Sequence, residues 1–377
     1  MNLYKKHPLF ILSIALVGLS LIIRFQLKEF TNRDMLIFEK WYAHLYNYGW
    51  AGLADGDFSN YPPAYLYLLW LSTLLSGWMG RVYAIKLIPT LFDLLSAFII
   101  FRMARLRYDD DTSFFSAASF FILPTIMFNS TGWGQIDSLY TSFLLVCVYL
   151  LLNEKPFWAM AAFGMAFSFK SQSIFLLPFL GILFLKGKIR WSHFLLIPVV
   201  YVIMGIPTAW IGRSWASILS IYVEQAGQFR VLSFNAPNLY IFIPSEFYET
   251  GTAVGLIIFF FGMAVWGWNN WSANFPLTHR NIILTAFTSL ALVPFLLPKM
   301  HERYFYPADV FSLVAAFFIP EIWFVPIAYQ VISLLSYTPF LLGANSQKVI
   351  PIAALMNTLT IGFLLWKQWK IAQEKTT

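Results

Sequence analysis

The chain is a succession of long apolar runs separated by short polar stretches. A membrane-spanning helix needs roughly 20 predominantly apolar residues, and fewer where flanking residues reach the interface. About twelve runs meet this requirement, which predicts an all-α polytopic membrane protein of about twelve transmembrane helices. The runs are 9–23, 86–102, 113–129, 137–152, 157–170, 172–186, 192–210, 252–270, 281–297, 304–319, 322–341 and 349–366.

The apolar segment 61–79 does not fit this series. As a further crossing, it would place two basic clusters, at 102–107 and 186–190, outside the membrane. The positive-inside rule disfavours that outcome. We therefore expect 61–79 to be a re-entrant helix or one lying in the outer leaflet, and both chain ends to face the cytoplasm.

This topology gathers the polar stretches on one side of the membrane. Residues of about 24–85 become one long extracytoplasmic loop with interfacial helices, followed by outer polar stretches at 129–137, 170–172, 211–250 and 299–303. The one-sided polarity indicates that the protein works at its outer face.

Composition excludes several classes of function. Hydrophobic residues make up 59% of the chain and charged residues only 11%, whereas soluble domains carry about 25% charged residues. A soluble enzyme, a nucleic-acid-binding module and a disordered tail are thereby excluded. The net charge of +7 instead indicates cytoplasmic loops and affinity for anionic membrane lipids. No metal-binding or nucleotide-binding motif is present, so we expect neither a metal nor a cofactor.

The first candidate for chemistry is Asp34. A helix capped by Thr31 or Asn32 would place this carboxylate in its first turn, where the helix dipole favours negative charge. Ile37, Phe38, Trp41 and Leu45 would form an apolar stripe along that helix, which favours a position in the membrane interface. Asp34 is then either a proton acceptor at the membrane surface or simply the start of an interfacial helix.

Two further stretches combine aromatic and polar groups. Trp133, Gln135 and Asp137 offer a flat ring and hydrogen-bonding groups, a combination that suits a sugar and equally an interfacial turn. Lys170, with Gln172 beside it, lies at membrane depth, where a lysine either lines a pathway or extends to the interface.

Residues 299–304 concentrate charge at the outer end of an apolar run. Lys299, His301 and Arg303, with Glu302 among them, could clamp a phosphate. A topology anchor is the weaker reading, because the positive-inside rule disfavours cations on this side.

Two other positions complete the candidates. Tyr61 opens a Tyr-Pro-Pro sequence that reads as a helix start at interface depth. Asp93 lies about two turns into an apolar run and is a functional candidate, or else a structural ion-pair partner of Lys86 or Lys170.

Taken in this order, the motifs resemble the GT-C class of polytopic glycosyltransferases, which use polyprenyl-phosphate sugars. The closest likeness is to the mannosyltransferases related to the second mannosyltransferase of GPI-anchor synthesis, including their bacterial relatives. The resemblance rests on Asp34, Trp41, Tyr-Pro-Pro at 61–63, Asp93, Gly-Trp-Gly-Gln-Ile-Asp at 132–137, Phe-Lys-Ser-Gln at 169–172 and His-Glu-Arg at 301–303. Arg303 replaces a lysine of distant relatives, and Lys-Ser-Gln replaces the Lys-Pro-Gln common among close ones.

The resemblance implies a GT-C-like fold, in which residues 1–210 form a catalytic membrane module and 211–377 a variable C-terminal transmembrane part. It also implies Asp34 as catalytic residue and a polyprenyl-phosphate sugar as donor. We expect the donor phosphate to be bound by Lys170, His301 and Arg303. The sugar and acceptor cavity is expected to be lined by Trp41, Tyr61, Asp93, Trp133, Gln135, Asp137, Gln172 and Glu302.

The expected reaction is an inverting, metal-independent transfer of a hexose, with mannose favoured, to a hydroxyl of a lipid or glycan acceptor. It would take place at the extracytoplasmic side of a prokaryotic plasma membrane. The alternatives are a secondary transporter, or a polymerase or ligase of lipid-linked glycans with a diphosphate-linked donor. The transporter is disfavoured because the chain shows no repeated halves and keeps its charges at one rim. The sequence predicts neither the acceptor nor the oligomeric state.

Overall fold

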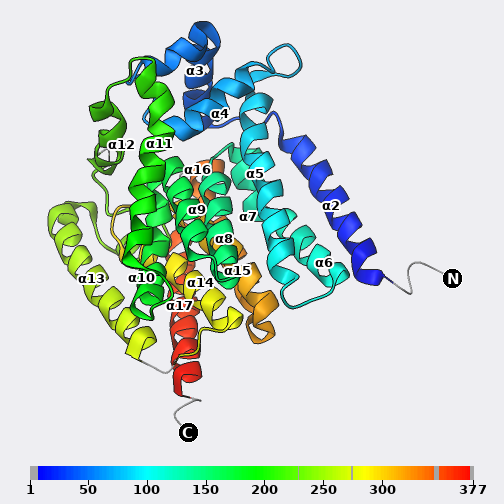
Figure 1. Ribbon diagram of the computed structural model, residues 1–377, viewed down its shortest axis with the longest axis vertical. Coiled ribbons are helices and arrows are strands. Elements are labelled where there is room, and N and C mark those ends of the chain that lie inside the picture. Colours follow the sequence, from blue (N-terminus) through cyan, green and yellow to red (C-terminus); the bar gives the residue numbers. More distant parts are fainter. Residues whose placement is uncertain (1–6, 228, 273–274, 344–347, 374–377) are drawn as a thin grey trace. The chain divides into compact units, whose positions relative to one another are not determined.

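The computed structural model describes residues 7–227, 229–272, 275–343 and 348–373. Most of these residues are helical (Figure 1), and the chain divides into two compact units. One unit consists of 1–173 and 192–228, the other of 174–191 and 229–377. The two units are separated by how their residues pack. The boundary predicted between 210 and 211 is of another kind, because it separates a catalytic from a variable part. That boundary therefore stays a prediction.

In the first unit, α8 packs against both α5 and α9, while α2 packs on α6 and α11 on α9 (Figure 1). Its α-helices are α2 (Pro8–Leu27), α3 (Arg33–Tyr48), α4 (Pro63–Thr73), α5 (Arg81–Ala104), α6 (Asp110–Phe121), α7 (Pro124–Met127), α8 (Asp137–Leu152), α9 (Pro156–Phe169), α11 (Leu196–Trp210) and α12 (Trp215–Gly227). Shorter turns are η1 (Gly49–Ala54) and the π-helical η2 (Phe128–Trp133), with η3 (Ser171–Leu176) and η4 (Trp191–Leu195) at the changes between units.

In the second unit, α14, α15 and α16 pack in sequence, and α17 lies against α16 and α14. Its α-helices are α10 (Leu177–Leu185), α13 (Tyr248–Ser272), α14 (His279–Leu296), α15 (Tyr306–Phe318), α16 (Phe324–Leu342) and α17 (Ile350–Gln373). Two short parallel strands, β1 (Ser233–Phe234) and β2 (Met300–His301), join the segment between α12 and α13 to the segment after α14. The remaining turns are η5 (Leu239–Phe242), η6 (Ser245–Phe247), η7 (Glu302–Phe305) and η8 (Pro320–Ile322).

The helices are those of a multi-pass membrane protein. Within the described residues, 7 helices are long and apolar enough to cross a membrane, or 8 if α6 and the 124–133 segment, bent by 54°, form one span. The remaining predicted runs coincide with shorter apolar helices, so the count of twelve crossings stays a prediction.

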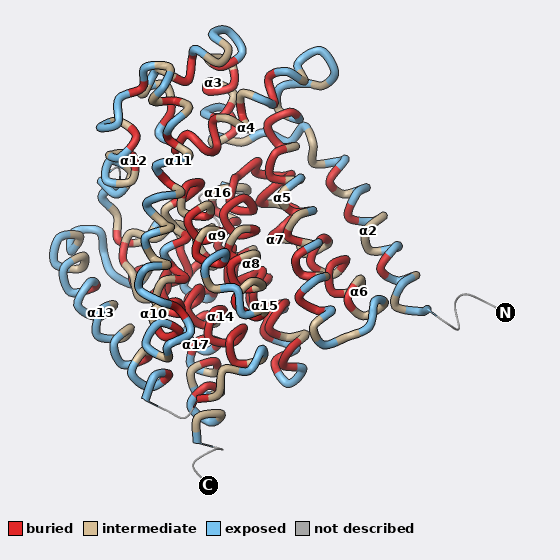
Figure 2. The backbone as a smooth tube through the Cα atoms, viewed as in Figure 1, coloured by how far each residue is buried: buried red, intermediate tan, exposed pale blue. Residues whose placement is uncertain are grey.

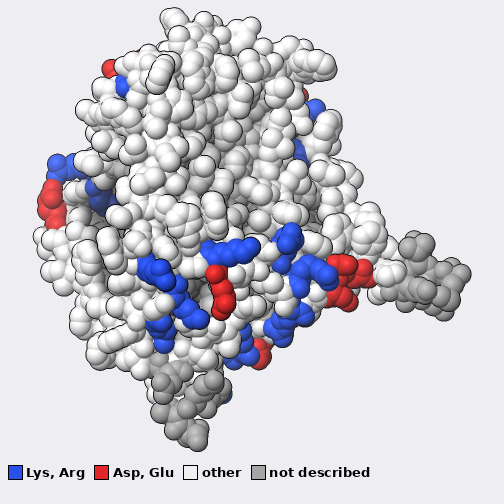
Figure 3. All heavy atoms as spheres, in the orientation of Figure 1, with Lys and Arg blue, Asp and Glu red and all other residues white. Residues whose placement is uncertain are grey.

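Burial separates lipid-facing helices from interior ones. In their most apolar windows, α2 and α13 are only 17% and 11% buried within the protein, whereas α14 is 83% buried (Figure 2). Side chains exposed along the poorly buried helices are large and apolar, and wide stretches of surface carry no charged side chain (Figure 3). Such a surface requires lipid as its solvent.

The segment between α2 and α5 holds α3, η1 and α4. Helix α4 has 11 residues, which at 1.5 Å per residue is about 17 Å and short of the roughly 30 Å hydrocarbon core. Its length favours the prediction that 61–79 does not cross. Helix α2 continues to Leu27, beyond the predicted apolar run 9–23, and includes a buried Arg24. The charge of this arginine ended the apolar run in the sequence, but a buried partner allows it inside the helix. The start of the outer loop at about residue 24 stays a prediction.

Candidate active site

The site begins at the first turn of α3. The Oδ1 atom of Asn32 accepts a hydrogen bond from the Met35 backbone N–H at 3.0 Å, so Asn32 is the N-cap and Asp34 lies in the first turn, as predicted. The buried stripe of the helix consists of Met35, Phe38, Trp41, Tyr42 and Leu45. The prediction that Ile37 belongs to this stripe was wrong, because Ile37 is 46% exposed. Met35, three residues before Phe38, lies on the buried face of the helix instead.

The Asp34 carboxylate is held by two side chains from a distant part of the chain. Its Oδ2 atom accepts hydrogen bonds from Trp133 Nε1 at 3.0 Å and from Gln135 Nε2 at 2.6 Å. Trp133 and Gln135 are buried, whereas Asp34 is half-buried. Asn32 Nδ2 adds a hydrogen bond to the Trp133 carbonyl at 3.1 Å. The start of α3 is therefore fixed to the 132–135 segment around one carboxylate oxygen.

Gly134 allows this arrangement in two ways. Its φ of +76° is in the left-handed region, where a β-carbon is disfavoured, and it directs its two neighbours toward Asp34. A β-carbon at this position would also lie 2.2 Å from the Met35 Cε atom. The glycine in Gly-Trp-Gly-Gln is therefore needed both for its conformation and for the close approach of α3.

A second carboxylate from the same motif is paired inside the first unit. Asp137, at the start of α8, has its Oδ1 atom 2.5 Å from Lys170 Nζ and accepts from Asn129 Nδ2 through Oδ2 at 2.9 Å. The Lys170 and Asp137 side chains are only 8% and 0% exposed. The ammonium predicted to bind a phosphate therefore already has a buried counter-charge.

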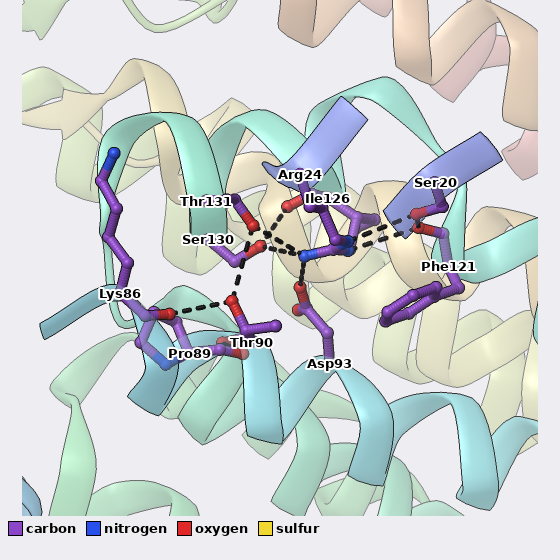
Figure 4. A network of polar contacts seen from close by, with 11 residues as sticks. Ser20, Arg24, Lys86, Pro89, Thr90, Asp93, Phe121, Ile126, Ser130 and Thr131 are labelled. Atoms are coloured by element: carbon purple, nitrogen blue, oxygen red, sulfur yellow. Dashed lines mark hydrogen bonds and ion pairs between the residues drawn. The ribbon is translucent and has the colours of Figure 1, made fainter. Parts of the chain in front are cut away.

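A buried network links the first helix to this segment (Figure 4). The Arg24 Nη1 atom lies 2.7 Å from Asp93 Oδ2 and donates to Ser130 Oγ at 2.9 Å and Thr131 Oγ1 at 3.0 Å. Ser130 and Thr131 belong to η2, which ends at Trp133. Arg24 thus ties α2, α5 and η2 together directly behind the donors that hold Asp34.

The partners expected for Asp93 were wrong. It pairs with Arg24 rather than with Lys86 or Lys170. Lys86 Nζ instead donates to the carbonyls of Leu27 at 2.9 Å and Phe30 at 2.5 Å, at the end of α2. Arg24 was missed because its charge seemed to end the first apolar run. The one local signal is Ser20, one turn earlier, whose Oγ accepts from Arg24 Nε at 3.3 Å.

Trp41 and Tyr61, both expected in a cavity, pack against each other. Their ring centroids are 5.1 Å apart, and Phe38 and Tyr65 complete an aromatic cluster that joins α3 to α4. Gln172 lies half-buried in η3.

The predicted phosphate motif lies in the second unit and is anchored there to the segment that precedes α13. The Lys299 backbone N–H donates to the Leu232 carbonyl at 2.7 Å, and the His301 ring stacks on Phe234 with centroids 4.8 Å apart. Glu302 is buried, with its Oε1 atom 3.4 Å from Arg303 Nη1. His301 and Arg303 thus share one short, structured segment. Across the described residues, no three His, Cys, Asp or Glu side chains gather as a metal site requires.

Fold and site together define a multi-pass helical membrane protein with a carboxylate held by an aromatic and an amide donor. Residues 60–211 match the family of dolichyl-phosphate-mannose-protein mannosyltransferases. This match supports a glycosyltransferase of the GT-C class. It covers less than half of the chain, including Asp93, 132–137 and Lys170, but neither Asp34 nor 299–303. A search of curated proteins finds no match.

Proposed function

We propose that this protein is an inverting GT-C glycosyltransferase with a polyprenyl-phosphate sugar as donor. It moves a hexose, with mannose favoured, to a hydroxyl of a lipid or glycan acceptor at the extracytoplasmic face of a prokaryotic plasma membrane. The family match supports the class of enzyme and donor. The observation that carries the proposal is the Asp34 carboxylate held by Trp133 and Gln135, both within the matched stretch.

In the proposed reaction, Asp34 accepts the proton of the acceptor hydroxyl while the oxygen of that hydroxyl attacks the anomeric carbon. The bond from the anomeric carbon to the phosphate oxygen breaks, and the lipid phosphate leaves with the electron pair. Such a leaving group needs no general acid. A single displacement inverts the anomeric centre, and general-base assistance contributes about 10²–10⁴-fold to the rate.

Trp133 and Gln135 act as positioning residues in this proposal. A general base is effective only when it is held in line with the proton that it accepts. Two buried donors on one carboxylate oxygen restrict the rotation of the Asp34 side chain. They supply the orientation that a half-buried carboxylate at the start of a surface helix would otherwise lack.

We further propose that His301 and Arg303 bind the donor phosphate, with Lys170 as a third cation. Cations that meet the charge developing on the leaving phosphate lower the barrier. Because Asp137 already compensates the Lys170 charge, we assign the larger share of this stabilisation to His301 and Arg303. That Asp93, Gln172 and Glu302 line the sugar and acceptor cavity stays a prediction.

The deciding experiment is the Asp34→Asn substitution, assayed with polyprenyl-phosphate mannose after purification in detergent. We expect transfer to fall by about 10²-fold or more, with unchanged thermal unfolding. The control is Asp57→Asn, an exposed aspartate of the same outer segment. Near-normal transfer by Asp34→Asn would remove this carboxylate from the mechanism.

The same assay separates the alternatives. Transfer only from a diphosphate-linked glycan would indicate a polymerase or ligase. Uptake of a substrate into proteoliposomes without turnover of a lipid-linked sugar would indicate a transporter.

A further inference from the structure

A groove runs between α13, α14 and α17 in the second unit, and none of the residues assigned to transfer lines it. Its volume is about 760 Å³, within the roughly 300–1,000 Å³ typical of ligand sites. Its walls are mostly apolar and include Phe261, Leu292, Phe295, Leu365 and Trp369. Phe261 and Trp369 are also exposed, so the walls of the groove continue into the apolar surface of the protein, where lipid is the solvent.

One end of the groove is polar. Asn269, Asn270 and Ser272 line it from the end of α13, and Gln368 from α17. Gln368 is only 4% exposed, and its Oε1 atom accepts from Trp266 Nε1 at 2.9 Å. Its Nε2 atom has no hydrogen-bond partner among the described residues. A buried amide donor without an acceptor is costly, so this side chain points to an acceptor supplied by a ligand.

Positive charge lies at the same end. Phe275 lines the groove, and its carbonyl accepts from Lys186 Nζ at 3.3 Å. Lys188 and Arg190 follow in the same short connection. The positive-inside rule assigns this basic connection to the cytoplasmic side. An anionic head group would therefore be complementary to the polar end.

The length of the groove fits one leaflet of a bilayer. On α17 its lining extends from Thr358 to Gln373, which is about 22 Å at 1.5 Å per residue. This is about half of the 40–45 Å thickness of a bilayer with its head groups. An acyl chain can therefore lie along the apolar walls while its head group remains at the polar end.

We propose that this groove binds an anionic phospholipid of the cytoplasmic leaflet. One acyl chain lies along α13 and α17, Gln368 Nε2 donates to an ester carbonyl, and Lys186 faces the phosphate. Basic sites between transmembrane helices on the cytoplasmic side are a recurrent means of holding anionic head groups. The site goes beyond the transfer reaction and depends on none of its residues.

The glycines of the groove provide a sharp test. A β-carbon at Gly362, which lines the groove on α17, would meet no atom within 4 Å. The β-carbon of Gly362→Phe therefore meets no wall atom, and its ring is the group that we expect to take up groove volume. The matched control is Gly267→Phe on α13, where a β-carbon would also meet no atom within 4 Å and which is not among the groove residues.

The measurement is mass spectrometry of the lipids that remain with the protein after detergent purification. We expect the wild type and Gly267→Phe to retain about one anionic phospholipid per chain, and Gly362→Phe to lose it by about tenfold. Equal retention in all three proteins would overturn the proposal. So would retention of only zwitterionic lipid or of a polyprenyl phosphate.

A second measurement needs no groove substitution and covers the case in which Gly362→Phe does not fold. We expect micelles containing phosphatidylglycerol to raise the unfolding temperature of the wild type more than micelles containing phosphatidylcholine. Lys186→Gln should remove most of that difference. An equal response of the wild type to both lipids would contradict an anionic site.

Discussion

At the scale of single residues, the proposed mechanism has Trp133 and Gln135 act on catalysis only through the carboxylate that they hold. Their two hydrogen bonds end on the same Asp34 oxygen. Removing either donor should leave the proton acceptor present but free to turn. The two donors and Asp34 should therefore behave as a unit, for which the effects of mutations are not additive.

We predict that Gln135→Leu lowers kcat by about 10- to 100-fold, with little change in KM for the donor. In the Asp34→Asn background, Gln135→Leu should lower kcat almost no further. Steady-state kinetics of the two single variants and the double variant check this. Additive losses would mean that Gln135 acts independently of Asp34.

A second prediction concerns Gly134. Gly134→Ala should destabilise the protein by about 1–3 kcal/mol, because the backbone is left-handed and the new β-carbon would meet Met35. It should also lower transfer, since the displaced segment carries both donors. Thermal unfolding of Gly134→Ala beside Gly77→Ala, whose β-carbon would meet no atom within 4 Å, provides the comparison. Equal stability of the two variants would contradict this role.

At the scale of elements, α2 and α5 are joined to η2 by one buried arginine. Arg24 pairs with Asp93 and donates to two hydroxyl groups of the turn that precedes Trp133 (Figure 4). A turn of π-helix is an irregular element that needs such side-chain support. The packing of three elements therefore determines where the Asp34 donors lie.

We predict that Asp93→Leu and Arg24→Met each lower the free energy of unfolding by about 3–5 kcal/mol, because each leaves a buried charge without its partner. The double variant, which leaves neither charge, should be more stable than either single variant. Chemical unfolding in detergent measures all three. If the double variant lost as much unfolding free energy as the two single variants together, Arg24 and Asp93 would not be coupled.

The local features of the site could be predicted from the sequence, and the long-range ones could not. A cap such as Asn32 depends on neighbouring residues, so its position before Asp34 followed from the helix pattern. The partners of Asp34 are 99 and 101 residues away, and Arg24 and Asp93 are 69 residues apart. Hydropathy placed Arg24 outside the helix, because a local window cannot include a distant counter-charge.

At the scale of the whole molecule, the direction in which the chain enters the membrane decides where every polar segment lies. The predicted topology rests on the positive-inside rule and on the short α4. If 61–79 crossed the membrane, every later segment would reverse. Asp57 and Arg105 lie before and after that segment. Whether these two positions lie on the same side of the membrane or on opposite sides therefore shows whether 61–79 crosses.

Cysteine labelling tests this directly. The natural Cys147 is fully buried, so a membrane-impermeant maleimide should not reach it in the folded protein. In intact spheroplasts we expect Asp57→Cys to be labelled and Arg105→Cys to be labelled only after permeabilisation. Because α5 crosses the membrane between them, positions 57 and 105 lie on opposite sides unless 61–79 crosses as well. A crossing by 61–79 would return position 105 to the side of position 57. Labelling of both positions from outside would therefore reverse the topology of every later segment, whereas labelling of position 57 alone would keep the 132–135 segment and Asp34 on the extracytoplasmic side.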